Sequence, residues 1–426
     1  MDRRGKQMPI RKPLQGYRVI EITRAQMGPF AGVMLADMGA EVIKVEPPET
    51  GEPTRWSYHW IVPGRVTPEG LDPGRLTNYE LHPYMIAHNR GKKSITVDID
   101  QEKGREIIYR LAKTADVFLQ NLRPGYVAER GLGYEDIKEH NPQIIYASSS
   151  GFGGKGPLCM KTSYDLVGTG EAGILYQTGD PDGPPTPIGT AIGDQFGAVM
   201  GAYGIVLALL VRERTGIGQY VDYCHVMSQI YLQAWEITHY LNTGHLPPKG
   251  GRGLGLIRGV WFIFPTKTRW ISIVGIDDRR WKGLCKAVGL AHLANDPRYS
   301  ETESRSIRRF EIRELLDKVF PTRPAEEWIP LLEKEDVICG YVNSYKDMFE
   351  RPGPLKEQIE AMEMVVERPH HYVGKVRMVG IPVKLSETPG EVPGPEPPLG
   401  HHTEEIMLEL GYTWDDILKL RQEKVI

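Results

Sequence analysis

Paired cysteines and a strong charge of one sign are both missing from this chain. Its four cysteines, Cys159, Cys224, Cys285 and Cys339, lie far apart and form no CxxC pair. That spacing argues against a disulfide scaffold and fits a reducing cytoplasm. The formal net charge is only -3 at pH 7, whereas nucleic-acid-binding proteins usually carry a basic surface. We therefore expect a cytoplasmic protein with no nucleic-acid partner.

The sequence also has little that would place it in a membrane. Residues 1–6 include charged side chains and lack the apolar stretch of a signal peptide. The longest apolar stretch, Gly197 to Val211, has about 15 residues, fewer than the roughly 20 that span a bilayer. We expect this stretch to form a buried core helix, and we expect no membrane partner.

Three familiar ligand motifs are incomplete. Residues 151–156 are rich in glycine but lack the GxxxxGK[ST] spacing of a phosphate loop. Gly28 stands alone where a dinucleotide-binding turn has GxGxxG, so a dehydrogenase is only an alternative at the level of the fold. The histidine pairs at 370–371 and 401–402 are adjacent and do not share the i, i+4 face of a metal site. The sequence therefore predicts no metal site.

What the chain does have is a regular alternation of strand and helix patterns. Strand patterns cover residues 18–23, 41–46, 94–98, 116–121 and 143–148, with helical patterns at 30–38 and 102–113. Such βαβ units form parallel sheets that helices cover on both faces, and ligands bind at the carboxyl ends of the strands. We predict an α/β fold with a Rossmann-like large domain and a mostly parallel sheet. Gln26, Asn121 and Gly151 lie at or just past predicted strand ends.

The pattern changes near residue 228. A helical stretch runs to about Asn242, and the Gly- and Pro-rich residues 245–255 are typical of a linker and an active-site flap. Residues 260–265 and 270–274 then predict two antiparallel strands, followed by amphipathic helices. We assign residues 1–227 to the large domain, 228–249 to a linker and 250–335 to a smaller α+β domain.

Asp194 stands immediately before a long apolar helix that we predict over residues 195–212. Backbone N–H groups at a helix N-terminus are unpaired and carry the positive end of the helix dipole. They stabilise an ionised carboxylate and an oxyanion that develops beside it. Asp194 therefore suits two roles, a helix cap and a nucleophile, and residue preference alone favours the cap.

A series of motifs runs in one order from near the N-terminus to the last residues. They are Gly16–Thr23, Gln26–Phe30, Leu35–Glu46, Asn89–Ile95, Asn121–Gly125, Tyr164–Asp165, Gly193–Asp194, Thr215–Asp222 and Pro398–Thr403. In these motifs the chain resembles the class III CoA-transferases, the formyl-CoA transferase or carnitine CoA-transferase family. The resemblance implies that Asp194 is the nucleophile and that two chains form an interlocked homodimer. It also implies that residues 336–426 are a linker and a C-terminal return to the large, CoA-binding domain.

The resemblance further implies where coenzyme A binds. It places Gln26 near the thioester, Ala25 and Met27 along the pantetheine arm, and Val97, Asn121 and Leu122 around the nucleotide. Phosphates pair with cations, and the basic residues of that neighbourhood include Arg90, Lys92, Arg123 and Arg130. Lys92 equally suits a solvated turn. Coenzyme A and acyl-CoA are substrates in this scheme, and we expect no other cofactor.

A CoA-transferase must keep an acyl group activated while CoA moves between two carboxylic acids. A carboxylate nucleophile achieves this, because Asp194 can attack the donor thioester to give an anhydride and then an aspartyl-CoA thioester. Aspartate is ordinarily ionised at neutral pH and needs no separate base. Backbone N–H groups of residues 151–156 or 245–255 are candidates for the oxyanion site.

Tyr164 and Asp165 distinguish this chain from the related α-methylacyl-CoA racemases. Those enzymes have a His-Asp pair at this position and use the histidine with the later aspartate as acid and base. A phenol loses its proton well above neutral pH and is a poor partner for α-proton exchange. Tyr164 and Asp165 instead resemble the Tyr-acid pair that lines the site of the transferases.

Other interpretations stay open. An acyl-CoA racemase or isomerase of the same superfamily is one, and a non-catalytic acyl-CoA-binding partner subunit is another. The chain could assemble with itself or with a homologous chain. An aromatic cluster of Trp56, Tyr58, His59 and Trp60 could line a pocket for a bulky acyl group or pack within a loop. The sequence identifies neither the acyl donor nor the acceptor acid.

Overall fold

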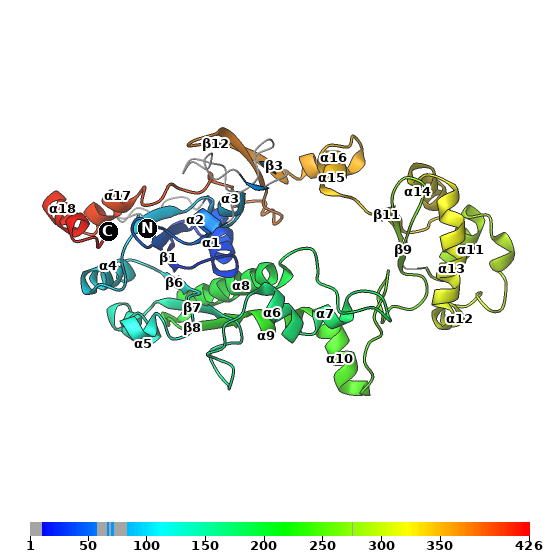
Figure 1. Ribbon diagram of the computed structural model, residues 1–426, viewed down its shortest axis with the longest axis horizontal. Coiled ribbons are helices and arrows are strands. Elements are labelled where there is room, and N and C mark those ends of the chain that lie inside the picture. Colours follow the sequence, from blue (N-terminus) through cyan, green and yellow to red (C-terminus); the bar gives the residue numbers. More distant parts are fainter. Residues whose placement is uncertain (1–10, 58–65, 68–69, 72–82, 275) are drawn as a thin grey trace. The chain divides into compact units, whose positions relative to one another are not determined.

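The computed structural model describes residues 11–57, 66–67, 70–71, 83–274 and 276–426. The chain divides into two compact units (Figure 1). The first unit comprises Met1–Ala172, Thr190–Leu232 and Ile359–Ile426. The second comprises Gly173–Gly189 and Gln233–Gln358.

A six-stranded sheet forms the centre of the first unit. Its strands are β1 (Arg18–Ile22), β2 (Glu41–Glu46), β5 (Lys93–Thr96), β6 (Val117–Gln120), β7 (Ile145–Ser150) and β8 (Tyr220–Cys224). Their order is β5-β2-β1-β6-β7-β8, and all five pairings are parallel. The chain builds outward from β1 to β5 and restarts on the other side of β1 with β6, as in doubly wound dinucleotide-binding folds. The predicted α/β fold with a parallel sheet is confirmed.

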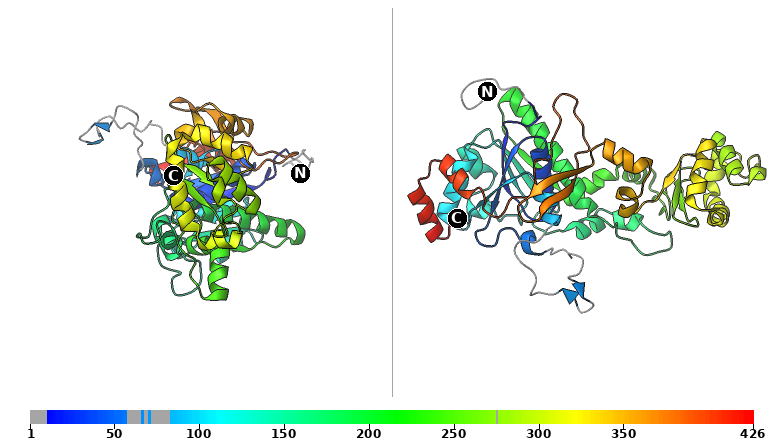
Figure 2. Two further views of the ribbon diagram at one scale, coloured as in Figure 1. Left: turned by 90° about the vertical axis from the view of Figure 1, so that its right-hand side faces the viewer. Right: turned by 90° about the horizontal axis from the view of Figure 1, so that it is seen from above.

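The strand sequences explain why helices cover both faces of this sheet. Successive side chains of a strand point to opposite faces, and in β1 Val19 joins one apolar cluster while Ile20 joins the other. A strand that is apolar at both positions needs cover on both sides. On the Ile20 face the cover comes from α4 (Glu102–Ala112), α5 (Tyr134–His140), α17 (Thr403–Glu409) and α18 (Trp414–Gln422) (Figure 1, Figure 2). On the Val19 face it comes from α1 (Met27–Asp37) and α8 (Ile192–Thr215).

Helix α8 is longer than the sequence predicted. It begins three residues earlier and ends at Thr215, where the following Gly216 adopts φ 73°, a left-handed conformation that glycine accommodates easily. Among the described residues it is the one helix whose length and composition would suit a membrane span. The face toward α1 and β8 is made of small residues, and a Cβ on Gly201 would lie 2.5 Å from the Tyr223 ring. This face therefore packs closely, whereas several large apolar side chains on other parts of α8 are exposed.

Shorter elements complete the first unit. They are α2 (Thr54–Ser57), α3 (Pro83–Asn89), α6 (Asp165–Glu171), α9 (His225–Leu232), and the antiparallel pairs β3 (Val66–Thr67) with β4 (Gly70–Leu71) and β12 (Val365–His370) with β13 (Gly374–Val379). Helix α16 (Pro354–Ala361) spans the boundary between the units.

The second unit has its own sheet and core. Strands β9 (Phe262–Phe264), β10 (Ile271–Ile273) and β11 (Cys339–Tyr341) pair antiparallel in the order β11-β10-β9. Its helices are α7 (Ile174–Gln177), α10 (Ala234–Thr243), α11 (Asp278–Ala287), α12 (Thr302–Ile307), α13 (Arg309–Val319), α14 (Ala325–Lys334) and α15 (Tyr345–Phe349). Trp281, Phe320 and Trp328 are buried among these elements in one apolar cluster.

Candidate active site

A pocket of about 270 Å³ opens at the carboxyl ends of β1 and β6. The strand order reverses between these two strands, and in open α/β sheets this is where ligands bind. The pocket is lined by Arg24, Ala25, Gln26, Met27, Asn121, Leu122, Arg123, Pro124, Tyr126, Ser149, Ser150, Gly151, Lys161, Thr162, Ser163, Tyr164, Asp194 and His225. A smaller cavity of about 90 Å³ shares Arg24, Leu122 and Tyr126 with it and also contains Val97. Most of the predicted site residues therefore lie together.

The N-terminus of α8 is capped by Asp165. The Oδ1 atom of Asp165 accepts the backbone N–H groups of Gly193 and Asp194 at 2.8 and 3.0 Å. A Cβ on Gly193 would lie 3.0 Å from that oxygen and 2.5 Å from Gln229 Nε2, so the glycine permits this close approach. The side chain of Asp194 is not the cap, and this interpretation from the sequence is wrong. Its carboxylate lines the pocket instead.

Asp194 has a hydrogen-bond partner that the sequence did not reveal. Nε2 of His225 lies 2.7 Å from Asp194 Oδ1, with 3% of the His225 side chain and 18% of the Asp194 side chain exposed. His225 is the first residue of α9 and directly follows β8. The one feature of the sequence that could have identified His225 is its position at the carboxyl end of a strand next to the site. Because 31 residues separate His225 from Asp194 in the sequence, no local pattern predicted the contact.

The loop after β1 is held in a conformation that alanine rarely adopts. Ala25 has φ 60°, in the left-handed region that costs a non-glycine residue free energy. Its N–H donates to Glu52 Oε2 at 3.1 Å. Next to it, the side-chain amide of Asn121 accepts from Arg24 N at 2.7 Å and donates to Arg24 O at 2.8 Å. Asn121 thus joins the loops after β1 and β6, and it also lines the pocket.

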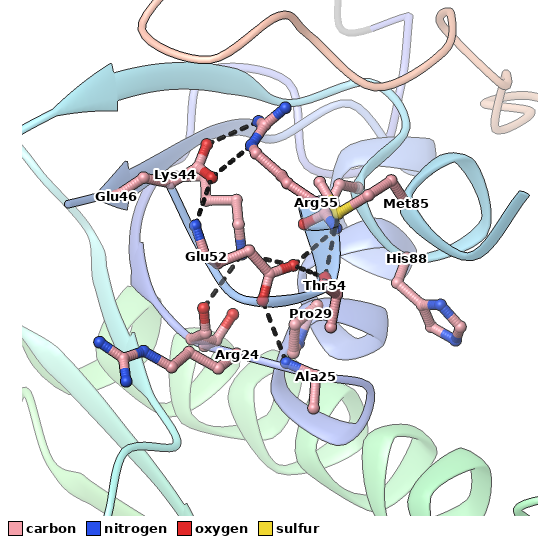
Figure 3. Close-up of polar contacts among 12 residues, drawn as sticks. Arg24, Ala25, Pro29, Lys44, Glu46, Glu52, Thr54, Arg55, Met85 and His88 are labelled. Atoms are coloured by element: carbon pink, nitrogen blue, oxygen red, sulfur yellow. Dashed lines mark hydrogen bonds and ion pairs between the residues drawn. The ribbon is translucent and has the colours of Figure 1, made fainter. Parts of the chain in front are cut away.

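A network of buried charged side chains packs against this loop (Figure 3). Lys44 Nζ donates to Thr23 O at 3.1 Å and lies 3.3 Å from Glu21 and 3.9 Å from Glu52. Burial acts to lower the pKa of Lys44, but the Glu52, Glu21 and Glu46 carboxylates outweigh burial and raise it. Buried charges are tolerated when they are paired in this way. The network fixes the backbone from which Arg24, Ala25 and Gln26 extend into the pocket.

Arg90 and Lys92 belong to the interior of the unit. Arg90 pairs with Asp37 at 2.6 Å. Lys92 Nζ lies 2.8 Å from the Glu21 carboxylate and donates to the Pro29 and His88 carbonyls at 2.9 Å each. Burial lowers the pKa of Lys92 to about 8. The structure gives both cations a structural role in place of the predicted phosphate contact, and Lys92 is not in a solvated turn.

Three other arginines lie at or near the pocket. Arg24 lines both cavities, no hydrogen bond or ion pair engages its guanidinium within the described part of the chain, and it points away from the buried network (Figure 3). Arg123 is largely exposed and lies 3.8 Å from Glu129. Arg130 packs over the Tyr126 ring at 3.5 Å and pairs with Asp100. Arg24, which the sequence analysis did not single out, therefore differs from the other two in lining both cavities without a partner for its guanidinium among the described residues.

The remaining candidates differ in accessibility. Tyr164 immediately precedes α6, lines the pocket and is 73% exposed. The N–H groups of Gly153 and Gly154 donate to Ser150 Oγ and Asp222 Oδ2 at 2.9 and 2.8 Å, so these two amides are not free oxyanion donors. Residues 245–255 belong to the second unit. Tyr58, His59 and Trp60 of the predicted aromatic cluster lie outside the described residues.

A carboxylate at the switch point of a parallel sheet is an arrangement typical of the active sites of α/β enzymes. No group of three His, Cys, Asp or Glu side chains that could hold a metal occurs within the described residues. Residues 14–403 match the model of CoA-transferase family III, and the chain belongs to this family. The predicted family and enzyme class are confirmed.

Relatives of this family resemble the chain over almost its whole length. It is 33% identical over 405 residues to the succinate–glutarate CoA-transferase of Agrobacterium fabrum, covering 95% of this chain and 97% of the relative. It is also 33% identical over 431 residues to the formyl-CoA:oxalate CoA-transferase of Streptomyces coelicolor, covering 97% and 99%. A CAIB/BAIF family protein from Brucella suis superposes with a TM-score of 0.79 at 31% identity, covering 94% and 100%.

Proposed function

We propose that this CoA-transferase moves CoA from an acyl-CoA donor to a free carboxylic acid through covalent intermediates on Asp194. One observation carries the proposal. His225 fixes Oδ1 of Asp194, while Oδ2 accepts no hydrogen bond from any described residue and the side chain lines the pocket at the switch point. A carboxylate held on one side and open on the other is suited to nucleophilic attack.

The proposed reaction has two halves. In the first, Oδ2 of Asp194 attacks the thioester carbonyl, the CoA thiolate leaves, and an acyl-aspartyl anhydride forms. The thiolate then attacks Cγ of Asp194, the donor acid leaves as its carboxylate, and an aspartyl-CoA thioester remains. In the second half the acceptor carboxylate takes the same path in reverse and leaves as the new acyl-CoA. The thioester energy is conserved throughout, because no water enters the sequence.

The pocket supports a definite placement of coenzyme A. We assign Ala25, Gln26 and Met27 to the pantetheine arm and the thioester. Val97 and Leu122 line the smaller cavity, which we assign to the nucleotide. Arg24 stands where the two cavities meet and is our candidate for a phosphate contact, since charge-assisted hydrogen bonds to phosphates are strong.

For the acids we propose small dicarboxylates. Relatives over nearly the full length are named for succinate and glutarate, for D-citramalate and for oxalate. The first experiment is therefore to incubate the protein with succinyl-CoA, treat it with hydroxylamine and map the peptides by mass spectrometry. We expect a hydroxamate on Asp194 and transfer of CoA to glutarate or oxalate.

The experiment compares two variants, one that removes the proposed nucleophile and one that serves as its control. Asp194→Asn should lose both the label and the transfer. Asp415→Asn, an exposed aspartate of α18, should keep both. Binding of acyl-CoA without any modification of Asp194 would be evidence against the covalent route. It would leave the acyl-CoA-binding subunit as the better description.

The His225–Asp194 contact also bears on the racemase alternative, because a histidine and an aspartate are the residue types used for α-proton exchange. Exchange with inversion needs an acid and a base on opposite sides of one carbon. These two side chains hydrogen-bond directly to each other and so cannot stand on opposite sides of a substrate carbon in this arrangement. Incubation of a chiral 2-methylacyl-CoA in heavy water tests this, and we expect no deuterium at the α-carbon.

We also propose that the active protein is a homodimer in the cytoplasm. Large apolar side chains of α8 are exposed in the single chain, including Val199, Tyr203, Val206, Leu207, Leu210 and Val211. Contiguous apolar surfaces of this kind mark interfaces. The four cysteines are all free thiols, which supports a reducing compartment.

A further inference from the structure

His225 engages the Asp194 oxygen on which negative charge develops in half of the proposed steps. When CoA thiolate or an acceptor carboxylate attacks Cγ of Asp194, the electron pair of the Cγ–Oδ1 double bond moves onto Oδ1. That oxygen becomes an oxyanion until the leaving group departs. We propose that Nε2–H of His225 is the oxyanion donor for these steps, an assignment that rests on the covalent route proposed above.

The protonation of the contact follows from its partners. An ionised carboxylate can only accept hydrogen bonds, so at the 2.7 Å contact Nε2 carries the hydrogen and donates to Asp194 Oδ1. This separation lies within the range of about 2.7 to 3.1 Å at which donors stabilise an oxyanion. The donor is aimed at Oδ1 before the reaction begins.

The surroundings of the other ring nitrogen, Nδ1, indicate that His225 donates a hydrogen bond and does not relay a proton. Nδ1 of His225 is buried and has no hydrogen-bond partner among the described residues. A Cβ on Gly168 would lie 2.9 Å from it, so the ring edge packs against the backbone of α6. A histidine that acts as a relayed base is normally oriented by an acceptor on its second nitrogen. His225 is instead oriented by packing.

The backbone N–H groups nearest to Asp194 already have acceptors, so they do not compete with His225 as oxyanion donors. The N–H groups of Gly193 and Asp194, at the N-terminus of α8, are taken by Asp165. The next amide, Gln195 N, donates to Ala191 O at 3.0 Å. The helix amides closest to the nucleophile are therefore engaged.

The same geometry makes the two halves of each transfer unequal. Attack by Asp194 Oδ2 on the thioester places the oxyanion on the acyl oxygen of the substrate, which His225 does not contact while it is bound to Oδ1. Attack on Cγ places the oxyanion on Oδ1, which it does contact. Loss of the His225 donor should therefore slow formation of the aspartyl-CoA thioester much more than formation of the anhydride.

The test is a rapid-quench experiment with succinyl-CoA, followed by intact-mass analysis that distinguishes succinylated from CoA-bearing protein. His225→Met and His225→Leu lack the donor, whereas His225→Gln keeps an N–H group on a side chain of similar length. For the first two we expect acylation of Asp194 to persist and the aspartyl-CoA thioester to form about 100-fold more slowly, the usual loss for one oxyanion donor. His225→Gln should recover at least about a tenth of the wild-type rate, because it restores a donor.

The outcomes separate the two proposals. Wild-type protein that forms no adduct on Asp194 would overturn the covalent route itself. Thioester formation at the wild-type rate in a folded His225→Met protein would overturn the role of His225 alone. So would a His225→Gln protein as slow as His225→Met, since the donor is then not what matters. His370→Gln removes a different buried histidine, in β12, and should leave the ratio of the two adducts unchanged.

Discussion

Arg24 and Arg130 differ in what their guanidinium groups already contact. Arg24 lines both cavities with no hydrogen bond or ion pair on its guanidinium from the described residues, whereas Arg130 is paired with Asp100 and packed on Tyr126. We predict that Arg24→Ala raises the KM for acyl-CoA about tenfold with little change in kcat, because a charge-assisted hydrogen bond contributes about 1.5 kcal/mol or more.

Arg130→Ala is the matched control and should raise the KM much less. Steady-state kinetics at two salt concentrations check both variants, since the Arg24 effect should shrink as salt screens the phosphate. Equal KM values for Arg24→Ala and the wild type would contradict the assignment of Arg24 to a phosphate contact.

The buried side chain of His88 should make the free energy of unfolding depend on pH. Burial is the main cause that lowers its pKa to about 4, and its Nδ1 lies 2.8 Å from the Tyr84 carbonyl. The unfolded chain protonates histidine near its ordinary pKa of about 6.5, so it binds more protons than the folded chain between these values. Stability should therefore fall as the pH drops from about 6.5 to about 4.

Urea unfolding at pH 7 and pH 5 measures this effect. At about 1.4 kcal/mol per pKa unit, His88 should account for about 2 kcal/mol of stability lost between these pH values. His88→Gln should show that much less pH dependence than the wild type. The same pH dependence in both proteins would show that His88 is not the group responsible.

Sequence reasoning was strongest for single residues that stand in a local pattern. Gln26 follows β1 and immediately precedes α1, Asp194 lies in the first turn of α8, and both line the pocket. It was weaker for charges, because Arg90 and Lys92 resemble surface cations until their partners Asp37 and Glu21 are known. Those partners come from distant parts of the chain. A side-chain pairing across the sheet leaves no local pattern to read.

At the scale of elements, the side chain that caps α8 should affect both the free energy of unfolding and the position of the proposed nucleophile. Asp165 accepts two N–H groups at that helix end. We predict that Asp165→Ala destabilises the protein by about 1 to 2 kcal/mol, the usual cost of a lost cap, and also slows labelling of Asp194. Urea unfolding and hydroxylamine labelling measure the two effects.

Thr413→Ala provides the comparison, because Thr413 caps α18 by accepting the Asp416 N–H at 3.2 Å. It should cost similar stability without slowing the labelling. If both variants slow labelling equally, the effect comes from general destabilisation and not from the α8 terminus. Asp165→Asn keeps a carbonyl oxygen that can accept and should be the milder change.

Five of the six sheet strands were predicted to within about two residues, because strands buried on both faces are rich in apolar residues. Strand β8 was not among them. Helix boundaries were less accurate. Helix α8 runs from Ile192 to Thr215, beyond both ends of its apolar segment, since its first turn is held by Asp165. A cap supplied by another helix cannot be read from the segment that it caps.

At the scale of the whole molecule, the exposed apolar side chains of α8 predict self-association. The double variant Leu207→Glu and Leu210→Glu places two charges on that surface and should shift the protein from dimer to monomer in light scattering coupled to size exclusion. Leu418→Glu on α18 changes a leucine that is 54% exposed and should leave the dimer intact. A wild-type protein that is monomeric at micromolar concentration would contradict the dimer.

The first unit is assembled from three separate stretches of chain, and this arrangement constrains the order of events during translation. Arg18, at the start of the central strand, pairs with Glu409 of α17 at 2.8 Å, and Ile406, Met407, Ile417 and Leu420 are buried in the same cluster as Ile20. All residues of the second unit leave the ribosome before these partners do. The smaller unit can therefore fold while the larger one still exposes the part of an apolar sheet face that α17 and α18 cover, and we expect chaperones to bind the nascent chain until these helices are made.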